Sequence, residues 1–132
     1  MSSDKHMKIL VIDDFSTMRK VIKNLLKQGG YNNVAEADDG ISALKILRSE
    51  TIDMIISDWN MPNMNGLDLL KTVRADRELS GTPFLMVTAE GLRDNVVLAV
   101  KEGVSNYIVK PFTAEVLNEK IEEILKRTEN KG

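Results

Sequence analysis

The stretch Ile9-Leu10-Val11-Ile12-Asp13-Asp14 places four consecutive apolar residues directly before two acids. An apolar run without polar alternation is typical of a strand buried on both faces, and such strands occur mainly in parallel sheets that helices cover on both sides. Residues 16–28 follow with apolar side chains at helical spacing, and Gly29-Gly30 ends that segment. The start of the chain therefore predicts a strand and a helix, with acids between them.

The same pattern recurs along the rest of the chain. Further strands are predicted at residues 34–37, 54–57, 84–87 and 107–109. The helices that follow them are predicted from apolar residues at helical spacing, namely Ile41, Leu44 and Leu47; Leu67, Leu70 and Val73; Val96, Val97, Ala99 and Val100; and Val116, Leu117, Ile121, Ile124 and Leu125. Strands alternating with helices predict an α/β fold of five βα units around a parallel sheet with right-handed crossovers.

Composition limits the kinds of partner that the chain can have. Its 132 residues are the length of one ordinary domain, and the net charge of −2 gives no electrostatic reason to expect nucleic acid or a membrane surface as partner. The chain has no cysteine, which excludes disulfides and thiolate metal sites and fits a reducing compartment. No stretch approaches the roughly 18 apolar residues that span a bilayer. We therefore expect a cytoplasmic protein.

Polar residues directly follow or end four of the predicted strands. They are Asp13 and Asp14, then Asp58, Thr88 and Lys110. One Asp at a strand end is more often a turn former or helix cap than a ligand, so the combination carries the argument. Because functional crevices in such sheets lie beyond the carboxyl ends of the strands, we expect these side chains to converge on one edge.

Charge indicates what this edge could do. Three carboxylates that lie close together repel one another, so either their pKa values rise or a cation lies among them. With oxygen ligands only, Mg²⁺ fits best, at one ion per domain. A carboxylate can also attack phosphorus, while a metal ion, a lysine and a hydroxyl neutralise the transferred group. The charges alone do not say which acid would be the nucleophile.

Four segments closely resemble the chemotaxis (CheY-type) subgroup of response-regulator receiver domains. They are Asp13-Asp14-Phe15-Ser16-Thr17-Met18-Arg19, Ser57-Asp58-Trp59-Asn60-Met61-Pro62-Asn63-Met64, Val87-Thr88-Ala89-Glu90 and Tyr107-Ile108-Val109-Lys110-Pro111-Phe112. The resemblance implies a flavodoxin-like, doubly wound fold with strand order 2-1-3-4-5. It implies a receiver domain over residues 7–127, with residues 1–6 and 128–132 as flexible tails, and a monomer.

The resemblance also implies roles for the acidic edge. Asp58 would be the phosphoacceptor for a chemotaxis histidine kinase, and Asp13, Asp14, Asp58 and the backbone carbonyl of Asn60 would hold Mg²⁺. Lys110 would neutralise the phosphoryl group. Phosphorylation and dephosphorylation would be self-catalysed, so that the chain is a signalling switch and not an enzyme with a turnover reaction. A separate phosphatase would be a further partner.

The resemblance further implies two switch residues and two residues that tune hydrolysis. Thr88 would follow the phosphate while Tyr107 turns inward, and this would reshape the surface that binds the flagellar motor switch protein. Asn60 and Glu90 match positions that tune hydrolysis of the acyl phosphate. Gly91-Leu92 depart from the subgroup, which puts motor binding in question. The resemblance also predicts a cis peptide between Lys110 and Pro111.

Two other functions are compatible with these residues. One is a receiver that relays phosphate or drains it from a shared kinase without binding a motor. The other is a Mg²⁺-dependent phosphatase of the haloacid dehalogenase kind, which also uses Asp, Thr and Lys at strand ends. That class resembles Asp-x-Asp near the first strand, whereas Asp13 and Asp14 are adjacent and Asp58 comes midway along the chain.

Overall fold

Strands and helices alternate along the whole described chain. The computed structural model describes residues 5–89 and 93–131. In these residues the elements are β1 (Ile9–Ile12), α1 (Ser16–Gln28), β2 (Val34–Ala37), α2 (Gly40–Ser49), β3 (Met54–Asp58), α3 (Gly66–Ala75), β4 (Phe84–Thr88), α4 (Arg93–Lys101), β5 (Asn106–Val109) and α5 (Ala114–Lys131). The predicted strands and helices are confirmed, with boundaries shifted by one residue for several strands.

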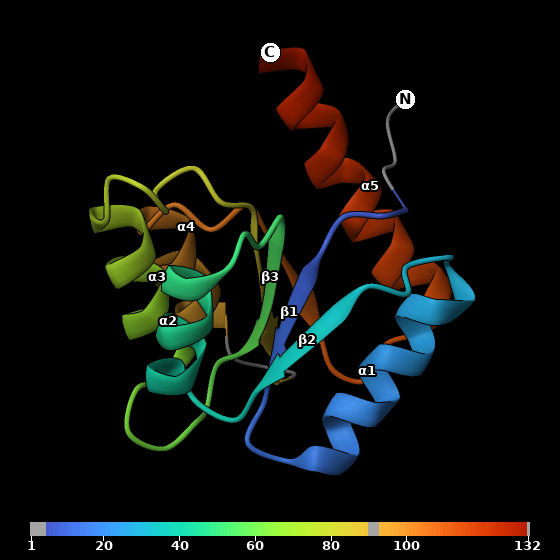
Figure 1. Cartoon of the computed structure of the whole chain (residues 1–132), viewed down its shortest axis with the longest axis horizontal. Coiled ribbons are helices and arrows are strands. Elements are labelled where there is room, and N and C mark those ends of the chain that lie inside the picture. Colours follow the sequence, from blue (N-terminus) through green and yellow to red (C-terminus); the bar gives the residue numbers. More distant parts are fainter. Residues whose placement is uncertain (1–4, 90–92, 132) are drawn as a thin grey trace.

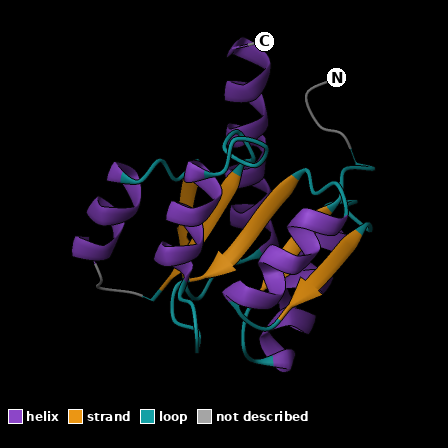
Figure 2. Ribbon diagram, turned by 60° about the vertical axis from the view of Figure 1, so that its left-hand side comes forward, coloured by secondary structure: helices purple, strands orange, loops and turns teal. Residues whose placement is uncertain are grey.

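The strands form one five-stranded parallel sheet in the order β2-β1-β3-β4-β5. This confirms the flavodoxin-like topology implied by the resemblance. Figure 1 shows α1 and α5 on one face of the sheet and α2, α3 and α4 on the other, and Figure 2, turned by 60°, shows helices in front of the strands and behind them. Because all strands point the same way, the loops after them lie at one edge.

The core consists of two apolar layers, one on each face of the sheet. In β1, Ile9 and Val11 pack toward α1 and α5, whereas Leu10 and Ile12 pack toward α2 and α3. All four side chains are fully buried, as the uninterrupted apolar run predicted. Full burial of one such side chain contributes about 1.5 to 3 kcal/mol. The central strands are therefore a rigid base for the loops at their ends.

Several helix residues that were predicted to lie on buried faces are exposed to solvent, unlike the residues of β1. In α4, Ala99 is buried, but Val97 and Val100 are 50% and 60% exposed. Ile41 in α2 and Val116 in α5 are also exposed, against the prediction for their apolar stripes. For α4 the physical reason is that its main contacts are with β4 and α3, so a narrow strip of the helix is covered. Helical spacing identified the helix correctly and overstated the width of its buried face.

Residues near both ends of the described chain contact the domain or continue its last helix. Lys5 Nζ donates a hydrogen bond to the carbonyl of Gly29 at 2.9 Å, and the carbonyl of His6 accepts one from Asn33 Nδ2 at 3.3 Å. The helix α5 continues to Lys131, because no Pro or Gly interrupts it after Arg127. Residues 1–4 and 132 lie outside the described part of the chain. None of the helices in that part combines the length and apolar character needed to cross a membrane.

Candidate functional site

Polar side chains from four strand ends meet at the carboxyl edge of the sheet. Parallel pairing aligns Ile12 of β1 with Ser57 of β3, so Asp13 and Asp58, each one residue further along, come side by side. On the other side of β3, Asp58 is aligned with Val87, which places Thr88 one step beyond it. The order of the strands in the sheet therefore brings together residues that are far apart in sequence.

Three carboxylates form the centre of this edge. One oxygen each of Asp13, Asp14 and Asp58 lies within 4.8 Å of the others. Asp13 is fully buried and Asp58 is 8% exposed, whereas Asp14 is exposed to solvent. A group of acids with two members removed from water is electrostatically costly unless a cation is present.

Lys110 supplies one positive charge to the acids. Its Nζ lies 3.1 Å from Asp58 Oδ1 and 3.8 Å from Asp13 Oδ2. The lysine directly follows β5, and its backbone N–H donates to the carbonyl of Thr88 at 2.8 Å. The peptide between Lys110 and Pro111 is cis, which confirms the prediction. The ammonium therefore pairs with two of the three carboxylates, and the cluster keeps a negative charge when all three are ionised.

Burial raises the pKa of both buried acids. For Asp58 the hydrogen bond and the charge of Lys110 act in the opposite direction and lower the pKa. For Asp13 the backbone N–H of Phe15, which donates to Asp13 Oδ1 at 2.9 Å, opposes the effect of burial on the pKa. In both cases the effect of burial is the larger one. Lys110 thus compensates the carboxylates only in part.

The donor atoms of the cluster fit a hard divalent cation. Among the described residues, Asp13 Oδ2 and Thr88 Oγ1 are buried side-chain oxygens without a hydrogen-bond partner. Orphaned buried oxygens beside two further carboxylates suit an ion such as Mg²⁺, which prefers a few carboxylates and retains waters. Asn60, whose backbone carbonyl was predicted as a further ligand, lies two residues after Asp58 on the loop to α3 and is exposed.

The loop after Asp58 is held by backbone hydrogen bonds. Trp59 N–H donates to the carbonyl of Val87 at 3.1 Å, and Gly66 N–H donates to the carbonyl of Trp59 at 2.8 Å. A side chain at position 66 would collide with the carbonyl of Asp58, so glycine is required there by close approach. Asn63, which has a positive φ of 67°, donates through Nδ2 to Asp39 Oδ2 at 2.8 Å.

Arg19 is a contact of the site to which the sequence analysis gave no role. Its Nη1 donates to the carbonyl of Asp13 at 2.6 Å, and its Nε donates to Glu36 Oε1 at 2.9 Å. Glu36 also accepts from Lys23 Nζ at 2.9 Å, and these two cations lower the pKa of its carboxyl. Helical spacing places Arg19 and Lys23 on one face of α1, but only the pairing of β1 with β2 brings Glu36 beside them.

The other predicted switch residues lie near this edge or outside the described chain. Tyr107 in β5 is partly buried against the apolar layer under α2, α3 and α4. Its ring centroid lies 5.2 Å from Lys120 Nζ of α5. Glu90, predicted to tune hydrolysis, and Gly91-Leu92 fall in residues 90–92, which are outside the described part.

A doubly wound five-stranded sheet that ends in three acids, a threonine and a lysine at one edge has the architecture of a phosphate-signalling receiver domain. The family model described as the response regulator receiver domain matches residues 9–122. The chain therefore belongs to the response regulator receiver family. This membership sets aside the haloacid dehalogenase-like alternative.

Known relatives indicate which kind of response regulator the chain is. The chemotaxis protein CheY of Pseudomonas aeruginosa is 59% identical over 121 residues, which cover 92% of this chain and 98% of the relative. A response regulator receiver domain protein from Clostridium thermocellum superposes with a TM-score of 0.85 at 35% identity, covering 96% of this chain and 99% of that chain. The chain is thus a two-component response regulator of the chemotaxis type.

A second similar structure contains a metal ion. It is the receiver domain of a sensor histidine kinase from Pseudomonas aeruginosa, with a magnesium ion coordinated in its active-site cleft. It superposes with a TM-score of 0.82 at 25% identity, covering 92% of this chain and 98% of that chain.

Proposed function

We propose that Asp58 accepts a phosphoryl group from a chemotaxis histidine kinase with the help of Mg²⁺, and that phosphorylation switches binding to the flagellar motor switch protein. One observation carries this proposal. The buried carboxylate of Asp58 lies 3.1 Å from Lys110 Nζ and within 4.8 Å of two further acids. The switch would work in the cytoplasm as a monomer, without nucleic acid or membrane as partner.

Asp13, Asp14 and Asp58 would hold one Mg²⁺, together with the backbone carbonyl of Asn60. The orphaned Asp13 Oδ2 and the magnesium ion in the similar receiver structure support this assignment. When bound, the ion neutralises the carboxylates and the oxygens of the incoming phosphoryl group. Asp13 and Asp14 would hold the ion through their carboxylates. Arg19 donates to the carbonyl of Asp13 and so helps to fix the position of that residue.

Phosphoryl transfer would begin at a carboxylate oxygen of Asp58. This oxygen attacks phosphorus and forms an acyl phosphate, while the phosphorus–nitrogen bond of the kinase's phosphohistidine breaks and the imidazole keeps the electron pair. Lys110 Nζ is placed to neutralise one phosphoryl oxygen, and the unpartnered Thr88 hydroxyl can donate to another. Attack of water on phosphorus would later return the Asp58 carboxylate and release inorganic phosphate, at a rate tuned by Asn60 and Glu90.

The change at Thr88 would reach the surface through Tyr107. A hydrogen bond from Thr88 to the phosphoryl group moves that side chain toward Asp58, and the partly buried Tyr107 turns into the space. The elements α4, β5 and α5 carry the exposed apolar residues Val100, Val109 and Val116, and α5 packs beside β5, the strand of Tyr107. Exposed apolar side chains of this kind suit a protein partner. We propose that the motor switch protein binds there.

Intact-mass measurement with acetyl phosphate and Mg²⁺ tests the acceptor assignment. The wild-type chain should gain the mass of one phosphoryl group, and Asp58→Asn should gain none. The exposed Asp53, which directly precedes β3 at the amino ends of the strands, provides a matched control, because Asp53→Asn removes an acid at the edge opposite Asp58 and should be phosphorylated normally. Phosphorylation that persists in Asp58→Asn would exclude Asp58 as the acceptor.

Calorimetric titration distinguishes a regulator that binds the motor from one that only drains phosphate from the kinase. The chain activated with beryllofluoride should bind a peptide of the motor switch protein more tightly than the unactivated chain. Val100→Asp should abolish the difference without changing phosphorylation. Normal phosphorylation together with equal affinity of both forms for the peptide would favour the phosphate sink.

A further inference from the structure

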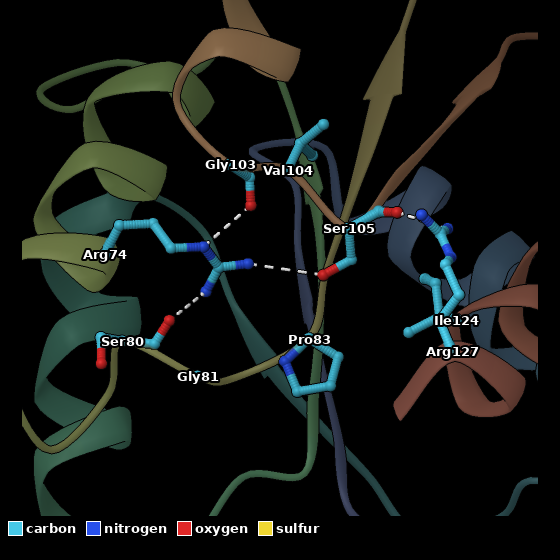
Figure 3. Close-up of a pocket in the computed structure, with 9 residues that line it drawn as sticks. All are labelled: Arg74, Ser80, Gly81, Pro83, Gly103, Val104, Ser105, Ile124 and Arg127. Atoms are coloured by element: carbon cyan, nitrogen blue, oxygen red, sulfur yellow. Dashed lines mark hydrogen bonds between the residues drawn. The ribbon is translucent and has the colours of Figure 1, made fainter. Parts of the chain in front are cut away.

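A pocket of about 500 Å³ lies at the edge of the sheet opposite the acidic cluster. Its nine lining residues come from the end of α3, the segment before β4, the turn between α4 and β5, and α5. Figure 3 shows them, with Arg74 and Arg127 as the charged members. The volume is in the range of small-molecule sites. No acid is among the lining residues.

The two guanidinium groups approach Ser105 from opposite sides (Figure 3). Arg74 Nη2 donates to the hydroxyl of Ser105 at 3.4 Å, and Arg127 Nη2 donates to its carbonyl at 2.6 Å. The Ser105 hydroxyl also accepts from Phe84 N–H at 2.9 Å. Because Arg74 Nη2 and Phe84 N both donate to this oxygen, the hydroxyl proton points toward neither of them. One serine thus joins two cations at the floor of the pocket.

Neither arginine has a carboxylate partner. Within residues 5–89 and 94–127, where side chains are described, no acidic oxygen lies within 4.0 Å of either guanidinium. Glu123 is close in sequence to Arg127, but its carboxylate accepts from Asn106 Nδ2 at 2.8 Å. Burial lowers the pKa of Arg74, as expected for a charge without a counterion.

Part of the donor capacity of the arginines remains available. Arg74 uses Nε and Nη1 for the carbonyls of Gly103, Ser80 and Thr82, at 2.7 to 2.9 Å. Within the described residues, Arg127 Nη1 has no hydrogen-bond partner, since Arg127 donates through Nε and Nη2. Two positive charges and free N–H donors in a recess without acids are the features that recognise phosphate and carboxylate groups.

We propose that this pocket binds an oxyanion group, phosphate or carboxylate, of a small molecule. Arg127 would be the main contact, because it is exposed and its Nη1 is free in the described chain, while the more buried Arg74 adds charge from the pocket wall. The site is independent of the phosphorylation proposed for Asp58. It lies beside β4 and β5 at their amino ends, whereas Asp58 lies at the carboxyl ends.

Titration of the ¹⁵N-labelled full chain with pyrophosphate tests the site, in EDTA and at constant ionic strength. The amide signals of Gly81, Gly103 and Ser105 should shift and saturate. Arg127→Gln should weaken binding about tenfold or more, because a charge-assisted hydrogen bond is lost. Lys126→Gln removes the same charge from the adjacent exposed position and should leave the affinity unchanged. A parallel titration with citrate separates carboxylate from phosphate ligands.

Three results would overturn the proposal. They are shifts that never saturate with either anion, equal weakening by Arg127→Gln and Lys126→Gln, and shifts confined to residues around Asp58. Asp58→Asn should bind pyrophosphate like the wild-type chain, so failure of the phosphoacceptor assignment and failure of this site are distinguishable. Arg74→Lys gives a second check, because it retains the charge but loses the planar fork and should also weaken binding.

Discussion

At the carboxyl ends of the strands, Asp13 and Asp58 are buried beside one lysine, and Asp13 Oδ2 has no hydrogen-bond partner. At the amino ends of β4 and β5, Arg74 is instead surrounded by backbone carbonyls and donates to three of them. The two edges of the sheet therefore differ. The carboxylates at one edge lack partners that a ligand could supply, whereas Arg74 at the other edge already binds the backbone of several segments. Hydrogen-bond satisfaction, and not burial alone, therefore distinguishes Asp13, which has an oxygen free for a ligand, from Arg74, whose donors mostly hold the backbone.

The largest effect on stability is expected at the amino edge. Arg74→Ala should lower the free energy of unfolding by about 3 kcal/mol, because the carbonyls of Gly103, Ser80 and Thr82 lose a charged donor. Arg77→Ala changes the same residue type at an exposed position and should alter it by about 0.5 kcal/mol or less. Urea denaturation measures both. Equal losses in the two variants would mean that Arg74 is not a structural tie.

At the carboxyl edge, the largest change in the free energy of unfolding should come from the binding of Mg²⁺. Mg²⁺ at about 100 times its Kd should raise the free energy of unfolding by roughly 2.7 kcal/mol, because it binds only the folded acids. The emission of Trp59, which directly follows Asp58, should change over the same concentration range. Arg74→Ala should gain the same increment as the wild type, since the two edges share no contact residues. A melting temperature and an emission spectrum that Mg²⁺ leaves unchanged would contradict a metal site.

A smaller effect, of opposite sign to that of Arg74→Ala, is expected from Asp13→Asn. Without metal it should raise the free energy of unfolding at pH 7 by about 1 kcal/mol, because one buried repelling charge is removed. It should also weaken the response to Mg²⁺. Denaturant melts in EDTA, with and without Mg²⁺, measure both effects, and a destabilised metal-free variant would show that the three acids do not repel one another.

The stabilisation by Asp13→Asn should depend on pH. Burial raises the pKa of Asp13 in the folded state above its ordinary value of 3.8. The wild type is therefore destabilised at pH values above the folded pKa, where the carboxylate is ionised in both states. That cost disappears as the pH falls below the unfolded pKa. The difference between variant and wild type should accordingly vanish below about pH 4, and a constant difference from pH 3 to 7 would exclude this cause.

The smallest effect should be that of Arg127→Gln on stability. Arg127 is exposed and donates to only one carbonyl outside its own helix among the described residues, that of Ser105, so the loss should be about 0.5 kcal/mol. Thermal melts of Arg127→Gln and Arg74→Ala would compare the two arginines directly. A loss in Arg127→Gln as large as that in Arg74→Ala would make both arginines structural ties and would argue against Arg127 as the main contact of the proposed anion pocket.

Much of the carboxyl edge could be predicted without a structure. Buried strands of a parallel sheet are apolar without interruption, so the acids after β1 and β3 mark where those strands end. Parallel strands also bring their ends to one edge, which is why Asp13, Asp58, Thr88 and Lys110 could be grouped in advance. The amino edge left no comparable signal, because Arg74 occupies an ordinary polar position near the end of an amphipathic helix.

The sequence by itself determined the five βα units, the positions of the acids at the strand ends and the resemblance that selected Asp58 among them. These features depend on local periodicity and residue type, and both can be read directly from the sequence. Only the tertiary structure decided that Asp13 is buried while the adjacent Asp14 is exposed, that Val97 and Val100 remain uncovered, and that Arg74 and Arg127 converge on Ser105. Burial and pairing depend on which elements pack together, and contacts between distant segments form only when the chain folds.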